Sequence, residues 1–167
     1  PTRSEHVHVD LFGRIDGIVD GGACQVGLES TIIDLTGQPT LLRPGGIPSE
    51  IIEETLSIRL AIAQESYGIK APGQLASHYA PRAALRLNAV KAGPNEKMLG
   101  FGSVACDLNL STSSDLTEAA GHLFSSLHTL DQNHDITIAV SPIPETGLGT
   151  AINDRLRRAA TPRPSDK

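Results

Sequence analysis

The sequence predicts an α/β fold, and two features of its apolar pattern carry this prediction. Between residues 83 and 160, strand-like apolar runs alternate with helix-like ones, an order typical of parallel strands joined by crossover helices. Before residue 60, a turn separates two runs rich in β-branched or apolar residues, which is typical of a hairpin. With 167 residues, the chain can bury one core or two small ones.

The predicted hairpin lies in the first third of the chain. Its first strand covers residues 28–35, a turn with glycine and proline follows, and residues 40–43 return as the second strand. A short helix comes next, with Ser49 placed to cap its first amides. Apolar residues between glycines and aspartates predict a further buried strand within residues 13–22.

The strongest helix pattern of the chain covers residues 116–130. Apolar side chains recur there at steps of three and four, which places them on one face, and Asp115 and Glu118 have the spacing of a capping box. Strands and a last helix are predicted around it, at residues 84–87, 98–102, 136–140 and 151–160. This order of elements favours a small parallel sheet covered by helices.

The turn before the last helix holds Gly147 and Gly149, a spacing found in phosphate-binding turns. A tight connection between strand and helix also explains these glycines, and we favour that interpretation. Within the helix, we expect Arg155, Arg157 and Arg158 to oppose its negative end.

Composition divides the chain into three parts. We predict an N-terminal module at residues 1–60, a connecting segment at 61–82 and a C-terminal module at 83–167. Glycine and proline keep the connecting segment from forming a long helix. The segment also carries His78 and Tyr79, side chains that gain from docking on a surface, so we expect it to lie over a pocket.

Charge and cysteine content narrow the class of function. The net charge of -5 argues against general attachment to nucleic acid, and the apolar runs are too short for a membrane span. Cys24 and Cys106 suggest reduced thiols and a cytoplasmic protein. His6 and His8 lack a third ligand at suitable spacing, so we expect no metal held by protein side chains alone.

Three groups of residues form the candidate site. Arg43 is followed by Pro44-Gly45-Gly46, and a guanidinium beside open backbone amides suits phosphate or carboxylate oxygens. Ser30 and Thr31 offer hydroxyls on the other strand of the hairpin, while His78 and Tyr79 offer stacking and hydrogen bonding. The alternatives are an arginine that solvates a strand end and a connecting segment that packs for stability alone.

Taken together, these motifs resemble the threonylcarbamoyl-AMP synthase family in its longer, two-domain form. The resemblance spans nearly the whole chain and is carried by Gly27-Leu28-Glu29-Ser30-Thr31-Ile32-Ile33-Asp34, Leu42-Arg43-Pro44-Gly45, Ser77-His78-Tyr79-Ala80-Pro81 and Asn153-Asp154-Arg155-Leu156. It implies part of a YrdC-like twisted α/β sheet domain, followed by a small Rossmann-like parallel-sheet domain.

The resemblance also implies an activity. The family makes L-threonylcarbamoyladenylate from L-threonine, bicarbonate and ATP, with Mg²⁺ accompanying the ATP, and passes it to downstream tRNA-modifying proteins. Such a nucleotidyltransferase works by charge and positioning, without a catalytic nucleophile. By resemblance, Ser30 or Thr31 contacts threonine, Arg43 contacts the nucleotide, and His78 and Tyr79 close over the adenylate.

One departure from the family pattern limits this expectation. The family's N-terminal half, with its basic phosphate-binding motif, does not occur in this sequence, so we expect the chain alone to be inactive. Two other functions stay open: a nucleotide-binding module without catalysis, and a protein-interaction module built on the C-terminal part.

Overall fold

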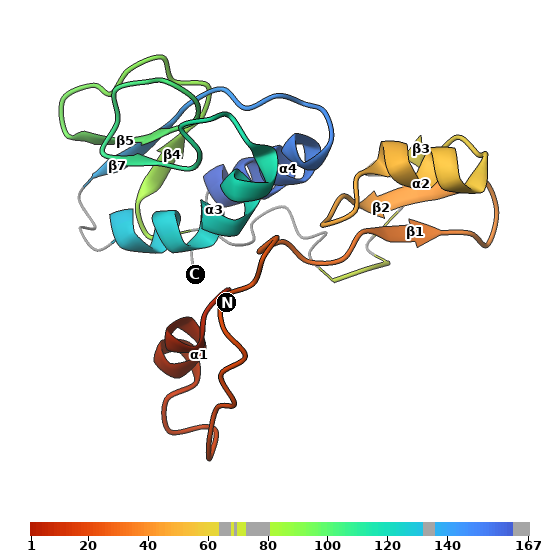
Figure 1. Cartoon of the computed structure of the whole chain (residues 1–167), viewed down its shortest axis with the longest axis horizontal. Helices are drawn as coiled ribbons and strands as arrows, with labels where there is room; N and C mark the ends of the chain where they lie inside the picture. Colours follow the sequence, from red (N-terminus) through yellow and green to blue (C-terminus); the bar gives the residue numbers. More distant parts are fainter. Residues whose placement is uncertain (64–67, 69, 73–80, 132–135, 162–167) are drawn as a thin grey trace.

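A computed structural model describes residues 1–63, 68, 70–72, 81–131 and 136–161. These residues form two sheets; most of the helices lie beside a sheet, whereas the N-terminal helix projects away from both (Figure 1). The first sheet contains β1 (Ile32–Asp34), β2 (Thr40–Arg43) and β3 (Ala61–Ile62). The second contains β4 (Ala84–Arg86), β5 (Glu96–Gly100), β6 (Leu108–Asn109) and β7 (Thr137–Val140). The helices are α1 (Ser4–Leu11), α2 (Ser49–Leu56), α3 (Leu116–Leu130) and α4 (Leu148–Ala160).

The predicted hairpin is confirmed, with a shorter first strand. β1 and β2 pair antiparallel, and their register shifts between Ile32 and Ile33. β3 extends the sheet by pairing parallel with β2. Residues 29–31 do not belong to β1, so the prediction of a strand from residue 28 is wrong there. Because β2 ends at Arg43, those residues meet the backbone of Gly45 instead of a partner strand.

The predicted strand at residues 13–22 is wrong. Ile15 and Ile18 are exposed and Val19 is fully so, at 100%. A strand needs a neighbour for its amide and carbonyl groups. No pairing of this segment exists in the described part of the chain, and Gly13 and Gly22 adopt positive φ angles that bend it.

The second sheet confirms the predicted α/β fold. Its strands lie in the order β4-β7-β5-β6, and every neighbouring pair is parallel. Side chains alternate between its two faces. Leu99, Ile138 and Val140 join the larger core with α3 and α4, whereas Met98 and Ala139 belong to a small cluster with Ala89.

The helix predictions are confirmed with corrections at the ends. Asp115 accepts hydrogen bonds from the amides of Thr117 and Glu118, so it is the N-cap of α3. The Glu118 carboxylate binds Ser111 instead of closing a capping box. Ser49 does not cap α2, because its hydroxyl donates to the Glu50 carboxylate (Oγ to Oε2, 3.2 Å).

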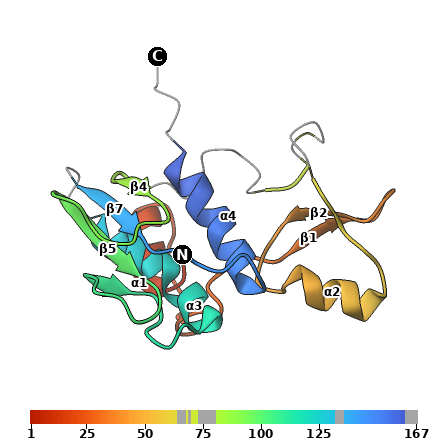
Figure 2. The same cartoon turned by 90° about the horizontal axis from the view of Figure 1, so that it is seen from above.

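α4 lies between the two sheets, and its side chains and backbone contact residues next to both. Figures 1 and 2 both place it beside the second sheet, with its N-terminal end toward α2 and the first sheet. It begins at Leu148, three residues before the predicted start. Within the described ranges, no helix is both long enough and apolar enough to cross a bilayer.

Candidate functional site

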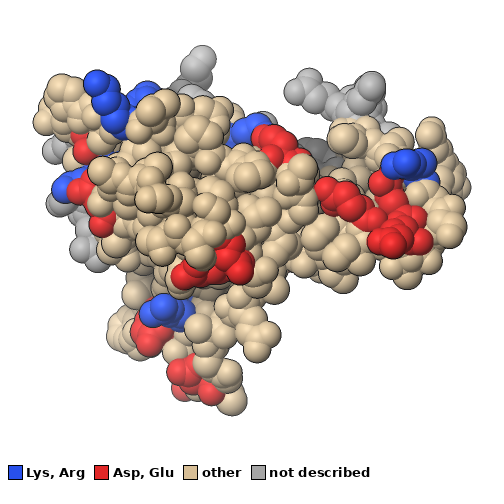
Figure 3. Space-filling model, turned by 45° about the horizontal axis from the view of Figure 1, so that its top comes forward, with Lys and Arg blue, Asp and Glu red and all other residues tan. Residues whose placement is uncertain are grey.

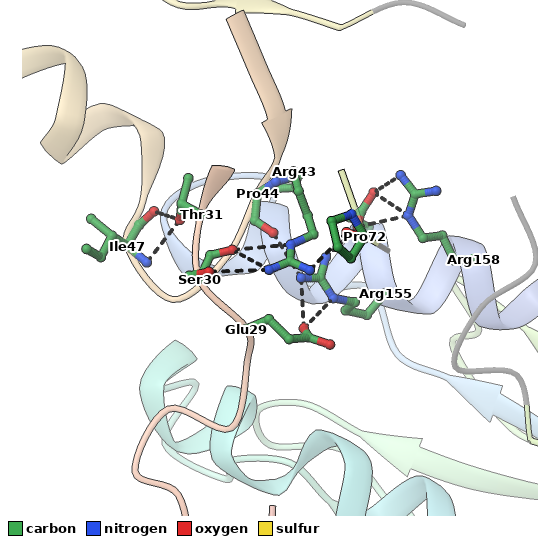
Figure 4. Close-up of polar contacts among 10 residues, drawn as sticks. Glu29, Ser30, Thr31, Arg43, Pro44, Ile47, Pro72, Arg155 and Arg158 are labelled. Atoms are coloured by element: carbon green, nitrogen blue, oxygen red, sulfur yellow. Dashed lines mark hydrogen bonds and ion pairs between the residues drawn. The ribbon is translucent and has the colours of Figure 1, made fainter. Parts of the chain in front are cut away.

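Arg43 is the centre of the candidate site. Its side chain is buried at the end of β2, with 6% of the residue exposed. Nε and Nη2 donate to the carbonyl of Ser30 at 3.2 and 2.9 Å, and Nη1 donates to the carbonyl of Pro72 at 3.0 Å (Figure 4). One guanidinium therefore joins the predicted threonine-binding residues to the predicted connecting segment.

The two predicted threonine-binding hydroxyls have different surroundings. Ser30 is exposed, and its hydroxyl lies 3.4 Å from Nη2 of Arg43. The Thr31 hydroxyl donates to the carbonyl of Ile47 and accepts from the Ile47 amide, at 3.2 Å for the second bond. Thr31 thus fixes the turn after β2, whereas Ser30 presents its hydroxyl beside Arg43.

The glycine pair after Arg43 lets the backbone of residues 29–31 approach closely. A Cβ on Gly45 would clash with the Glu29 carbonyl oxygen and with the Thr31 nitrogen. The Gly46 amide donates to that same Glu29 carbonyl at 2.8 Å. Only a residue without a side chain fits at position 45, so this motif sets the shape of the site before any ligand contact.

Arg155 is a site residue that the sequence analysis missed. It belongs to α4 and is 1% exposed. Its Nε and Nη2 lie 3.0 and 2.9 Å from Glu29 Oε2, and Nη2 also donates to the Pro44 carbonyl at 3.1 Å (Figure 4). Our expectation that Arg155 only opposes the negative end of its helix is therefore wrong.

A signal for Arg155 was present in the helical period. It lies three residues after Ile152 and four before Ala159, two buried residues, so it sits on the apolar face of α4. A charged residue on an apolar face needs a partner that the sequence alone does not identify. Asp154 supplies part of this partnership by accepting from both Arg155 and Arg158.

Glu50 of α2 covers the N-terminus of α4. The Gly147 amide donates to the Glu50 carboxylate at 3.0 Å. Hydrogen bonds from the amides of Glu50 itself and of Gly147 lower the pKa of the Glu50 carboxyl. A Cβ on Gly149 would meet the Pro144 carbonyl oxygen, which confirms the favoured interpretation of a tight strand-to-helix connection.

Acidic side chains gather over α2, as Figure 3 shows. Glu50, Glu53 and Glu54 line an open hollow of about 540 Å³ together with Ser57, Ile58 and Arg59. Phosphate groups are disfavoured beside three carboxylates. The hollow beside α2 is therefore unsuited to the phosphates of a nucleotide.

Two family models match the sequence of this chain. A family model described as the C-terminal domain of threonylcarbamoyl-AMP synthase matches residues 47–161, which is more than half of the chain. The chain belongs to the threonylcarbamoyl-AMP synthase family. A second model, described as telomere recombination, matches residues 1–45. The resemblance inferred from the motifs is thereby confirmed.

Curated members of this family cover almost the whole chain. The chain is 36% identical to the threonylcarbamoyl-AMP synthase of Pyrococcus abyssi, with 96% of this chain and 54% of that protein covered. It is 33% identical to the synthase of Bacillus subtilis and 31% identical to that of Schizosaccharomyces pombe, of which it covers 53% and 49%. The chain therefore spans about half the length of the curated relatives it matches.

Solved structures agree with this assignment. A crystal structure of Pyrococcus abyssi Sua5 complexed with L-threonine matches with a TM-score of 0.81 at 34% identity, covering 96% of this chain and 54% of that one. A variant of that protein, with a histidine and the following tyrosine replaced by alanine, matches with a TM-score of 0.80 at 33% identity, covering 96% and 53%. These matches confirm the predicted α/β fold.

Not all predicted site residues can be placed. The structure brings Ser30 and Arg43 together and puts Pro72, from the predicted connecting segment, against Arg43. His78 and Tyr79 lie outside the described residues. Their predicted position over the adenylate stays a prediction.

Proposed function

We propose that this chain forms the threonine-binding and nucleotide-binding part of an L-threonylcarbamoyladenylate synthase. In the proposed reaction, the amine of L-threonine combines with bicarbonate to give a carbamate and water. A carbamate oxygen then attacks the α-phosphate of ATP, and the bond to pyrophosphate breaks. The product is a carboxylic-phosphoric anhydride that downstream tRNA-modifying proteins consume in the cytoplasm.

One observation carries the proposal: Arg43 contacts both the Ser30 carbonyl and the Pro72 carbonyl. In this proposal, the cation at this junction stabilises the negative charge that the reaction gathers on the carbamate and the α-phosphate. Catalysis of such a transfer depends on oriented cations and amides and on exclusion of water. A guanidinium has five N–H donors, and the contacts in the described part of the chain use the one on Nε, both on Nη2 and one on Nη1 of Arg43. The second N–H of Nη1 is then available for a ligand.

The proposed roles follow the geometry of the hydroxyls. Ser30 contacts threonine, because its hydroxyl is exposed beside Arg43. Thr31 acts on threonine through the position of its backbone, since its hydroxyl is bonded to Ile47. His78 and Tyr79 form the one His–Tyr dipeptide of the chain and are proposed to cover the adenylate. The related Pyrococcus abyssi protein also has a histidine followed by a tyrosine, and its variant with both replaced by alanine has a solved structure.

Magnesium is proposed to enter with ATP. In the described ranges, no group of three or more His, Cys, Asp or Glu side chains could hold a metal ion. Mg²⁺ bound to nucleotide commonly takes most of its ligands from phosphates and water. The residues of this chain are then required to bind and orient the substrate complex, and no metal ligand is assigned among them.

A second candidate is a module that binds a nucleotide without chemistry. The burial of Arg43 and its bonds to two carbonyls favour a guanidinium that shapes the site over one that takes part in the reaction. Turnover separates the two functions. Binding without product would support the second candidate.

Calorimetric titration with L-threonine and with ATP tests the proposal. The wild-type chain is expected to bind both, and Arg43→Lys is expected to weaken ATP binding by about tenfold or more, because lysine cannot bind the Ser30 and Pro72 carbonyls and a ligand at once. Arg157→Lys, at an exposed ion pair with Glu145, is the matched control. An Arg43→Lys chain that binds ATP as well as wild type would contradict the nucleotide role.

A pyrophosphate-release assay tests the activity itself. With threonine, bicarbonate and MgATP, the chain alone is expected to show no turnover. The chain extended by the N-terminal half that the family pattern includes is expected to release pyrophosphate. Turnover by the chain alone would overturn the expectation that it is incomplete.

A further inference from the structure

We propose that Arg155 of α4 is a positioning residue that holds residues 29–31 in the geometry that binds L-threonine. This inference rests on the proposed function, and it assigns a task to the C-terminal module. The residues proposed to contact threonine lie in the first module, whereas the guanidinium that fixes them comes from the second.

The contacts of Arg155 lie on both sides of the site. Glu29 directly precedes Ser30, and its carboxylate accepts a hydrogen bond from Arg155 Nε and forms an ion pair with Arg155 Nη2. Pro44 directly follows Arg43, and its carbonyl receives a bond from Arg155 Nη2 at 3.1 Å. Figure 4 shows Arg155 next to Arg43, with Glu29 and Pro44 bound to its donors. A movement of Arg155 therefore displaces both chain segments that form the site.

A second anchor holds the same segment just before Glu29. Val26 and Leu28 pack against the core of the C-terminal module. Gly27 lies on α3 so closely that a Cβ there would be 2.8 Å from the Ala120 carbonyl oxygen. Residues 26–28 are thus fixed by α3 and residue 29 by α4, and Ser30, the next residue, is exposed.

The chemistry of the site requires arginine at position 155. The buried guanidinium reaches Glu29, Pro44 and Asp154 at once with donors that lie in one plane. Lysine presents its three N–H groups from a single nitrogen and cannot reproduce this arrangement. A conservative Arg155→Lys substitution therefore keeps the charge and removes the geometry.

The competing explanation is that Arg155 only joins the two modules. In that case a substitution lowers the stability of the contact, while folded molecules bind threonine as before. If Arg155 positions residues 29–31, the threonine affinity of the folded molecules falls as well. The two explanations differ in ligand affinity and not only in stability.

Hydrogen exchange in the whole chain measures the positioning directly. The Gly46 amide donates to the Glu29 carbonyl, so its exchange rate reports on the segment. In Arg155→Lys, this amide is expected to exchange at least about tenfold faster, while the amides of Leu123 and Ile138 in the C-terminal core keep their wild-type rates. An unchanged Gly46 rate would overturn the inference.

Glu29→Gln is the second variant, in case Arg155→Lys does not fold. The Glu29 side chain is 35% exposed, so this substitution removes the charge without changing the packing of a buried group. It is expected to accelerate Gly46 exchange in the same direction. Arg157→Gln, on the exposed side of the same helix, is the matched control and is expected to leave the exchange rate of the Gly46 amide unchanged.

Titration with L-threonine shows whether Arg155 affects threonine binding or only joins two parts of the chain. Arg155→Lys and Glu29→Gln are each expected to raise the dissociation constant about tenfold or more, with Arg157→Gln equal to wild type. A variant with accelerated Gly46 exchange and wild-type affinity would overturn the positioning role. If the wild-type chain binds no threonine, the proposed threonine site fails for this chain, and the exchange rates alone then decide whether Arg155 holds the segment.

Discussion

Two buried arginines determine the backbone of the candidate site. Arg43 binds the Ser30 carbonyl from the side of β2, and Arg155 binds Glu29 and Pro44 from α4. Arg43 bonds mainly to main-chain carbonyls, whereas Arg155 bonds to one carbonyl and to the carboxylates of Glu29 and Asp154. A guanidinium that binds two carbonyls fixes their separation, which is the geometric requirement of a preorganised site.

Gly45 and Gly46 provide a matched test of this close backbone packing. In Gly45→Ala, the new Cβ meets backbone atoms of residues 29–31, which no side-chain rotation can relieve. We expect a loss of about 1–3 kcal/mol in the free energy of unfolding, typical of overpacking. In Gly46→Ala, the nearest atom is Val26 Cγ1 at 3.5 Å, an ordinary contact, so we expect a change within about 0.5 kcal/mol.

Urea unfolding of the two alanine variants checks this prediction. Both substitutions replace glycine by the same residue at neighbouring positions, so the effect on the unfolded chain is similar. Equal losses at positions 45 and 46 would show that the packing against residues 29–31 contributes nothing to stability.

At the scale of secondary-structure elements, predictability followed the length of the pattern. α3 was predicted from residue 116 to 130 because its apolar stripe repeats over four turns and is buried in the structure. The segment at residues 13–22 also has apolar residues but no partner strand in the described ranges. Its composition alone therefore gave a wrong prediction of a strand. β6 has two residues, too few for a period to appear.

The stability contributed by the connection between β4 and β5 depends on pH. Glu96 accepts hydrogen bonds from the Arg86 side chain and from the Gly93 amide. These bonds, with that from Arg86 the stronger cause, lower the pKa of the Glu96 carboxyl from 4.5 to about 2. Because the folded pKa lies below the unfolded one, the stabilisation is complete above about pH 4.5 and is lost as the pH falls toward 2.

Glu96→Gln tests this dependence. We expect the variant to have a lower thermal midpoint than wild type at pH 6, and the difference to shrink as the pH falls from 4.5 to about 2. In wild type, a carboxyl carbon titration by NMR should place the pKa of Glu96 near 2, and Arg86→Gln should raise it. A difference in midpoint that stays constant down to pH 2 would refute the assigned contacts.

At the scale of the whole molecule, the site is formed by contacts between distant parts of the sequence. The motif around Arg43 was found from the sequence because its residues are neighbours in the chain. Its contact with Pro72 was not, and neither was the pairing of Glu29 with Arg155, 126 residues apart. Helical period places a charge on the inner face of α4, but only the packing of α4 between the sheets identifies its partner.

The two sheets differ in the size of the apolar core that packs against each. The larger core consists of residues between 83 and 156, with Val26 and Leu28 packed against it from the first module. The first sheet buries Leu41 and Leu42 and depends on α4 through Glu29 and Glu50. Burial of apolar surface is the main source of stability, so the C-terminal module has the means to fold alone and the first sheet does not.

We therefore expect residues 83–167 to unfold cooperatively when produced alone, and residues 1–72 to remain unfolded. The C-terminal piece should be less stable than the same module in the whole chain by about 2 kcal/mol, because the surface covered by Val26 and Leu28 becomes exposed. Circular dichroism with urea unfolding of both pieces measures this. A cooperative transition in residues 1–72 would show that the first sheet does not need α4, and the dependence of the site on the C-terminal module would then lose its structural basis.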